Sequence, residues 1–121
     1  MTARDIVVSY LTAMEERDLA RAATFMVPGS KMTFPTGKVL DSLDVLVAWS
    51  KTRYKFVRKS YRLFDEMTRD GVTTIYCCGV LNGEWLDGTA ITDVRFIDRF
   101  EIKDGKITDQ QVWNDLAEFR K

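Results

Sequence analysis

The strongest constraint on the fold is a change in the spacing of apolar residues between positions 55 and 58. Before it, apolar residues recur at the interval of one helix face; after it, they recur at every second residue, as in a strand. Asp70-Gly71 and Asp104-Gly105 separate alternating stretches, and Asp-Gly is typical of tight hairpin turns. The sequence therefore predicts an α+β fold, with helices first and a long meander afterwards.

The expected elements follow from this spacing. Helices are expected at about 3–16, 18–26 and 42–55. Strands are expected at about 31–34, 58–69, 72–82, 90–103 and 106–114. Helices packed on one face of a curved antiparallel sheet form a cone, whose interior side chains either fill it or line a pocket. The chain is long enough for one core, and we interpret residues 1–121 as a single domain.

Composition excludes several classes of function. The 18 basic and 18 acidic residues give a formal charge of zero, so no overall field attracts nucleic acid or an acidic membrane. No apolar run has the length of a membrane span, and the first residues lack a secretory signal pattern, so the cytoplasm is expected. Histidine is absent, which removes the commonest general base and the Ser-His and Cys-His pairs. No metal site and no cofactor are expected.

A carboxylate interrupts the apolar row of the strand expected at 90–103. By alternation, Asp98 falls on the same face as Phe96 and Phe100. A carboxylate in apolar surroundings is costly to ionise, so its pKa should rise, and the neutral acid can donate a hydrogen bond to a developing enolate oxygen. Two alternatives remain: a structural carboxylate held by Arg95, Arg99 or the backbone, or a bulge that turns Asp98 toward water.

The stretch KTRYKFVRKSYR, residues 51–62, carries six basic residues and no acid. Such a stretch suits an anionic cofactor tail or a nucleic acid backbone. We favour a structural interpretation, because cations are favourable at a helix C-terminus and charges on an edge strand discourage association between sheets. Arg58, Lys59 and Arg62 are accordingly expected on a solvated edge strand, and no nucleic acid partner is expected.

Four motifs together resemble the SnoaL-like branch of the NTF2-like superfamily, which includes ketosteroid isomerase. They are VVSYLTAMEERDLA (7–20), TFPTGKVLDS (33–42), RFIDRFEIKDGKIT (95–108) and WNDLAEF (113–119). The resemblance covers nearly the whole chain and implies a cone-shaped α+β fold and a homodimer formed through the sheet. Asp98 and Tyr10 match the oxyanion-hole acid and tyrosine of ketosteroid isomerase. Phe34 stands where that enzyme has its general base.

Two hypotheses follow. The first is an isomerase, dehydratase or cyclase that acts on a small apolar or aromatic ketone-like ligand, with Asp98 and Tyr10 as catalytic hydrogen-bond donors. The second is a non-catalytic binding or dimerisation module of the same fold. No membrane partner is expected in either case. The residues expected to line the pocket, each with ordinary core filling or a solvated strand end as its alternative, are Met14, Phe34, Trp49, Val80, Phe96, Phe100, Gln110 and Val112.

Overall fold

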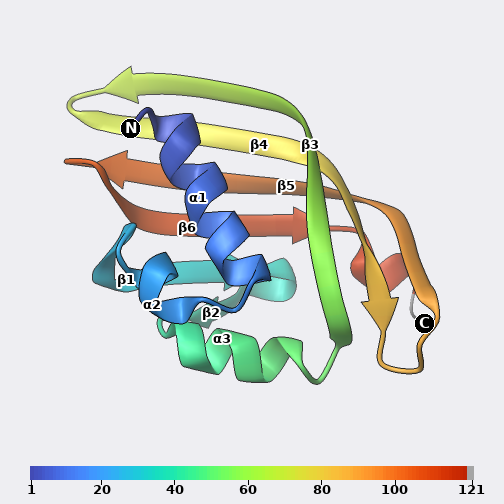
Figure 1. The fold of residues 1–121 in the computed structure, drawn as a ribbon. Coiled ribbons are helices and arrows are strands. Elements are labelled where there is room, and N and C mark those ends of the chain that lie inside the picture. The colour runs from blue at the N-terminus through green and yellow to red at the C-terminus, as the bar shows by residue number, and fades with distance from the viewer. Residues whose placement is uncertain (120–121) are drawn as a thin grey trace.

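The computed structural model describes residues 1–119 and has helices on one side of a curved sheet (Figure 1). The helices are α1 (Ala3–Glu15), α2 (Leu19–Ala23) and α3 (Leu43–Ser50), with 3-10 turns η1 (Pro35–Gly37) and η2 (Leu116–Phe119). The strands are β1 (Met26–Phe34), β2 (Lys38–Leu40), β3 (Tyr54–Arg69), β4 (Val72–Trp85), β5 (Ala90–Lys103) and β6 (Lys106–Asn114). In this part of the chain they form one sheet in the order β2-β1-β6-β5-β4-β3.

The meander of β3 to β6 follows the sequence prediction. Asp70 and Gly71 both have positive φ, at 52° and 78°, and so do Asp104 and Gly105, at 51° and 76°. Two successive residues in this region are the mark of the hairpin turn that Asp-Gly predicts. β5 and β6 have the expected bounds, β4 continues to Trp85, and β3 begins at Tyr54 rather than at residue 58. The α+β prediction is confirmed.

The first half of the chain departs from the prediction in several bounds. α2 is shorter than expected, α3 ends at Ser50, and β1 begins at Met26 rather than at residue 31. The strand passes through Pro28-Gly29 because it bulges there: its register with β6 shifts between Met26 and Lys31, and Gly29 has a φ of 77°. β1 pairs with β6 in parallel, so the sheet is mixed rather than antiparallel throughout.

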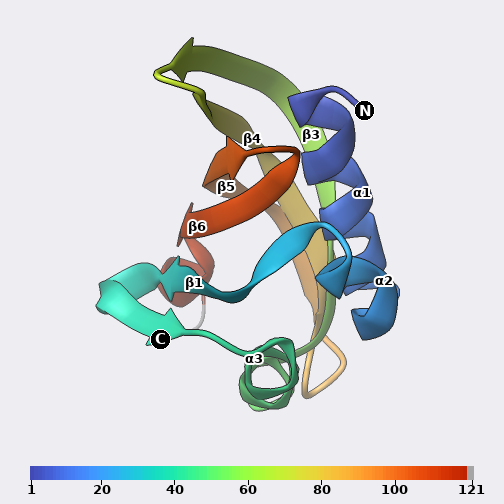
Figure 2. The same cartoon turned by 90° about the vertical axis from the view of Figure 1, so that its left-hand side faces the viewer.

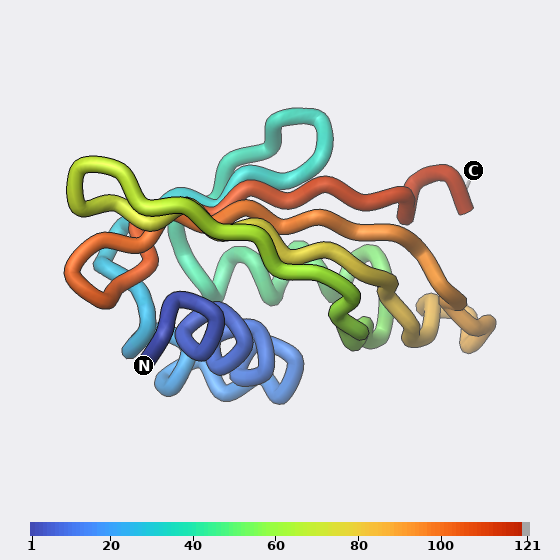
Figure 3. Tube along the Cα trace, turned by 90° about the horizontal axis from the view of Figure 1, so that it is seen from above, coloured from blue at the N-terminus to red at the C-terminus, as the bar shows by residue number. Residues whose placement is uncertain are grey.

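α1 covers the inner face of the sheet. It begins at a capping box, in which the Thr2 hydroxyl accepts the Asp5 N–H and the Asp5 carboxylate accepts the Thr2 N–H, at 3.1 and 3.0 Å. Its apolar stripe is buried, from Ile6 to Met14. The edge-on views show α1 and α2 on the same side of the curved sheet (Figures 2 and 3). No helix among residues 1–119 is long and apolar enough to cross a membrane.

Two glycines of β4 allow β3 to bend closely over it. A Cβ on Gly79 would lie 1.9 Å from the carbonyl oxygen of Ser60, and one on Gly83 would lie 2.1 Å from that of Phe56. The register of β3 and β4 shifts close to both contacts. Figure 1 shows β3 first crossing the end of the sheet and then turning sharply to run along β4. The close approach therefore sets the curvature of the sheet on this side.

We predict that Gly79→Ala lowers the free energy of unfolding by at least about 2 kcal/mol, because the new methyl group overlaps backbone that cannot move aside as a side chain can. Urea denaturation followed by circular dichroism measures the change. Cys78→Ala, one residue away and only half-buried, is the control and should cost much less. An equal loss in both variants would contradict the role of the close approach.

Candidate functional site

Asp98 faces the core. Its side chain is fully buried, and the register is continuous through it, with Cys77 of β4 on one side and Val112 of β6 on the other. No bulge turns it toward water, so that alternative is wrong. The arginines on either side are paired elsewhere: Arg95 with Asp115 at 2.7 Å, and Arg99 with Glu101 at 3.2 Å. They are therefore not the partners of Asp98.

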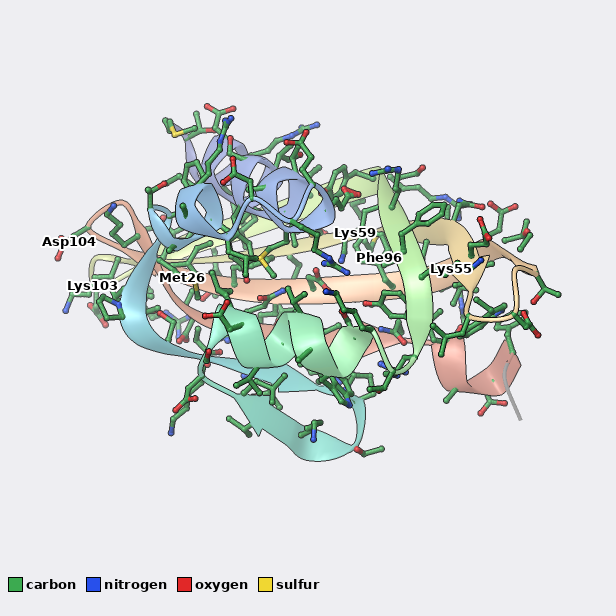
Figure 4. All side chains as sticks on the ribbon, turned by 60° about the horizontal axis from the view of Figure 1, so that its bottom comes forward. Met26, Lys55, Lys59, Phe96, Lys103 and Asp104 are labelled. Carbon is green, nitrogen blue, oxygen red and sulfur yellow. The ribbon has the colours of Figure 1, made fainter. Side chains whose placement is uncertain are left out.

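The partner of Asp98 is Lys59 of β3. Its Nζ lies 3.4 Å from Asp98 Oδ2 and 5.1 Å from the centroid of the Phe96 ring, and its side chain is only 17% exposed. Figure 4 labels Lys59 and Phe96 on the inner side of the bent β3. β3 is an edge strand, as expected, but the prediction that Lys59 is a solvated charge on it is wrong, because Lys59 is in register with Leu81 of β4, whose side chain is buried in the core.

The sequence contained a signal for Lys59. Val57, Lys59 and Tyr61 alternate along β3 as Phe96, Asp98 and Phe100 do along β5. A lysine in one apolar row and an aspartate in another are two buried charges of opposite sign, and buried charges are found paired. The alternation of residues 57–61 was hidden by the flanking basic residues, which suggested a charged edge.

The environment of this pair perturbs both groups. Burial raises the pKa of the Asp98 carboxyl, and the Lys59 ammonium and the Gln110 amide oppose that rise without cancelling it. Burial alone would lower the pKa of Lys59, but Asp98 and further acidic neighbours outweigh it, so the pKa of Lys59 is raised. Neither Asp98 oxygen has a partner at full hydrogen-bond geometry among residues 1–119. The pair is therefore desolvated and only partly compensated, which is costly for stability.

Tyr10 lies beside this pair on α1. Its hydroxyl donates to Oε1 of Gln110 at 3.1 Å, with the Met32 sulfur at 3.6 Å, and its ring packs edge-on against Phe100 at 6.0 Å. Burial raises the pKa of Tyr10, and the charge of Asp98 adds to the rise. The hydroxyl is thus a neutral donor, held by a side chain rather than by the backbone.

A cavity of about 90 Å³ lies between α1, α3, β3 and β6. The residues that sequence analysis assigned to the pocket and that line this cavity are Tyr10, Met14, Phe34, Trp49, Gln110 and Val112. Further lining residues, which it did not assign, include Glu15, Arg17, Ser50, Arg53, Tyr54, Val57 and Lys59. The structure therefore brings most of the predicted residues together and adds the charged ones.

Four assigned residues do not line the cavity. Three of them point inward but are buried and do not reach the cavity surface: Asp98, Phe96 and Phe100. The cavity is lined instead by Lys59, the partner of Asp98. Val80 is buried, but its side chain lies on the outer face, because it is in register with the exposed Arg95 and alternates with inward-facing neighbours. The expectation that Val80 faces the interior is therefore corrected.

The size of the cavity limits what it encloses. A protein cavity of about 150 Å³ holds one benzene, so this one encloses on the order of four non-hydrogen atoms. Phe34 and Trp49 narrow it, with their rings edge to face at 5.1 Å. A ligand larger than this extends past the rim or displaces these two rings.

No protein-family model matches the chain, and no curated protein matches its sequence. Solved structures match its fold over nearly the whole length. An NTF2-like protein of unknown function from Burkholderia pseudomallei has a TM-score of 0.73 at 16% identity, covering 96% of this chain and 92% of that one. The chain has the NTF2-like fold. The resemblance seen in the sequence is thereby confirmed at the level of fold.

Two further solved structures share the NTF2-like fold of this chain. TerC, co-crystallised with polyporic acid, has a TM-score of 0.75 at 17% identity and covers 95% of this chain and 92% of its own. A putative polyketide cyclase from Pseudomonas putida has a TM-score of 0.70 at 15% identity, and the match covers 98% of this chain and 96% of the cyclase chain. At these identities the likeness shows the fold alone.

We predict that Lys59→Met makes stability more sensitive to pH. Without the ammonium, the pKa of Asp98 rises further, and a carboxyl with a raised folded pKa keeps its proton longer when folded than when unfolded. The free energy of unfolding therefore falls as pH rises above about 4, the unfolded pKa of aspartate, and it falls more steeply in the variant than in the parent, by a total on the order of 3 kcal/mol. Urea denaturation at several pH values measures this.

Two controls accompany this experiment. Lys55→Met removes an exposed lysine of the same strand, paired with Glu84 at 3.1 Å, and should leave the pH dependence unchanged. Adding Asp98→Asn to Lys59→Met removes the titrating group and should flatten the curve. If the curves of Lys59→Met and the parent run parallel, the two charges are not coupled.

Proposed function

We propose that this NTF2-like chain binds a small carbonyl compound and stabilises negative charge on its oxygen. The observation that carries the proposal is the Lys59–Asp98 pair, because one of its members lines a cavity with aromatic walls and the other is fully buried. A desolvated ion pair costs stability relative to an apolar pair of the same size, so its presence beside a cavity suits a functional role.

Lys59 is the group that meets the ligand. Its pKa is raised, so it stays an ammonium at neutral pH, and a positive charge in a water-poor site strongly stabilises an enolate oxygen. Asp98 acts through Lys59, by holding the ammonium in place and keeping it charged. Tyr10 and Gln110 supply further hydrogen-bonding groups beside the pair. This differs from ketosteroid isomerase chemistry, in which the aspartic acid itself donates the hydrogen bond.

Glu15 is the candidate general base. It lines the cavity, and its Oε1 accepts the backbone N–H of Lys59 at 2.8 Å, which fixes the carboxylate at the wall. In the proposed reaction this carboxylate takes a proton from the carbon next to the carbonyl, and the electron pair moves to the carbonyl oxygen beside Lys59. With a β,γ-unsaturated ketone, return of this proton from Glu15 to the γ-carbon of the dienolate completes an isomerisation. With a β-hydroxy ketone, the enolate collapses to a carbon–carbon double bond, and the β-hydroxyl takes the proton from Glu15 and leaves as water.

The second candidate function is ligand binding without turnover. The narrow cavity favours it, because Phe34 and Trp49 leave little room for a reacting substrate. The hydroxyl of Tyr10 is also already bonded to Gln110. A ligand that binds without exchange of its α-proton for solvent deuterium would support this candidate over the enzyme.

We predict that phenols, which mimic an enolate, bind the parent more tightly as their acidity increases. Lys59→Met should weaken binding by more than about tenfold and abolish the dependence on acidity, because the stabilising charge is lost. Tyr10→Phe should weaken binding less. The emission of Trp49, which lines the cavity, reports binding, and Trp49→Phe identifies its share of the signal.

Lys55→Met is the matched control, since it removes the same charge from an exposed site on the same strand. Unchanged phenol affinity in Lys59→Met, with normal folding, would refute the role proposed for the ammonium.

We propose, as a separate property, that the outer face of the sheet forms a homodimer. Leu63, Tyr76, Ile97 and Trp113 lie on this face and are 42–52% exposed. Exposed apolar residues gathered on one face are typical of association surfaces. This agrees with the dimer that the family resemblance implies.

We predict that the parent sediments as a dimer and that Ile97→Lys sediments as a monomer in analytical ultracentrifugation, since the new charge would have to be buried at the interface. Val39→Lys is the control, because Val39 is equally exposed but lies on the edge strand β2. A monomeric parent would refute the dimer.

A further inference from the structure

The cavity carries more positive charge than the chain around it. Its lining includes Arg17, Arg53 and Lys59, and one carboxylate, that of Glu15. Three positive charges and one negative charge leave an excess of two, whereas the whole chain has a formal charge of zero. Even when the buried Asp98 is added, one positive charge remains in excess. The chain thus concentrates positive charge at this site.

Arg17 is held firmly at the rim. It follows α1 with a φ of 60°, and its guanidinium donates to the Met14 carbonyl at 3.0 Å and to Ser50 Oγ at 3.3 Å. These contacts join the C-terminal ends of α1 and α3. They occupy the group with neutral partners, so its charge remains uncompensated.

Arg53 lies between α3 and β3, and its backbone N–H donates to the carbonyl of Ser50, the residue whose hydroxyl Arg17 contacts, at 2.9 Å. Its guanidinium carbon lies 4.8 Å from the centroid of the Trp49 ring. In residues 1–119 neither Arg53 nor Arg17 forms an ion pair with a carboxylate, whereas Arg95 and Arg99 of β5 both do. Cations are favourable after the C-terminus of a helix, which explains why arginines occur here. The position after a helix does not explain why both arginines line the cavity and neither is paired with a carboxylate.

We propose that the ligand is a compact oxo acid, whose carbonyl end enters the cavity at Lys59 and whose carboxylate is bound at the rim by Arg17 and Arg53. This inference rests on the proposed function and names its ligand class. Guanidinium groups bind carboxylates through paired hydrogen bonds, which suits an anion at the rim. The enclosed volume, on the order of four non-hydrogen atoms, matches a methyl ketone group and one further carbon.

The arrangement also explains the two kinds of positive charge at the site. Lys59 is neutralised by Asp98 and lies deep, where it can respond to charge that develops on a carbonyl oxygen. The rim arginines are not neutralised, so they can pair with the carboxylate of a ligand. A neutral ketone interacts only with Lys59, whereas an oxo acid interacts with Lys59 through its carbonyl and with the arginines through its carboxylate.

The test compares 4-oxopentanoate with 4-oxopentanamide, which has the same number of non-hydrogen atoms and no charge, and with 2-pentanone. Binding to the full chain is measured by the emission of Trp49 or by calorimetry, at low and at moderate salt. We expect the acid to bind the parent at least tenfold more tightly than the amide at low salt. This advantage should shrink as salt rises, because the rim is exposed to solvent.

Arg53→Met should remove most of the advantage of the acid over the amide, and Arg53→Lys should restore part of it. Arg58→Met is the matched control, because Arg58 also stacks on a ring, that of Phe56 at 5.4 Å, but does not line the cavity. Its variant should keep the full preference. Arg53 is used in preference to Arg17, whose contacts with Met14 and Ser50 also support the fold.

The outcomes separate this inference from the proposed function. If acid, amide and ketone bind equally, the carbonyl site stands and the oxo-acid inference is overturned. If the acid is preferred but Arg58→Met removes the preference as Arg53→Met does, the anion binds to general surface charge and the inference is again overturned. If none of the three probes binds, both the proposed function and the inference fail.

Discussion

The ion pair between Lys59 and Asp98 is the interaction on which the interior of this protein depends. Transferring a carboxylate or an ammonium from water to the protein interior costs several kcal/mol for each group. This cost is of the same order as the whole free energy of unfolding of a domain of this size. Removing either residue leaves the other as an uncompensated buried charge. β3 and β5 are not neighbours in the sheet, so the pair also joins strands that share no backbone hydrogen bonds.

This pair exists because β3 bends. Gly79 and Gly83 let the backbone of β3 approach β4 more closely than any side chain would allow, and the bend brings Lys59 over the inner face. The same bend places Tyr54 and Val57 at the cavity wall. The two glycines of β4 thus determine the position of Lys59. The aromatic wall, the ammonium and the rim arginines all follow from that geometry.

The site that results has a graded polarity. Its deepest part is a neutralised ion pair beside an uncharged tyrosine and an amide, its walls are aromatic, and its rim is cationic. Such a gradient suits a ligand with a polar inner end, a short apolar middle and an anionic outer end. The outer face of the same sheet has a different character, since exposed apolar residues lie there beside paired charges. The sheet therefore separates a small-molecule site from a candidate association surface.

Local patterns in the sequence determined the meander, its two Asp-Gly hairpins, the helical stripe of α1 and the inward direction of Asp98. Alternation, turn chemistry and helical spacing act over a few residues, so they can be read without knowing the fold. Tyr10, Gln110 and Val112 were assigned to the interior by the same logic.

Only the tertiary structure decided which charges meet. The partner of Asp98 lies 39 positions away in the sequence, on a strand whose bend depends on backbone contacts with glycines of a third segment. The parallel pairing of β1 with β6, the outward direction of Val80 and the position of Arg17 and Arg53 at one rim are of the same kind. Each depends on how distant segments pack, and no local spacing of residues carries that information.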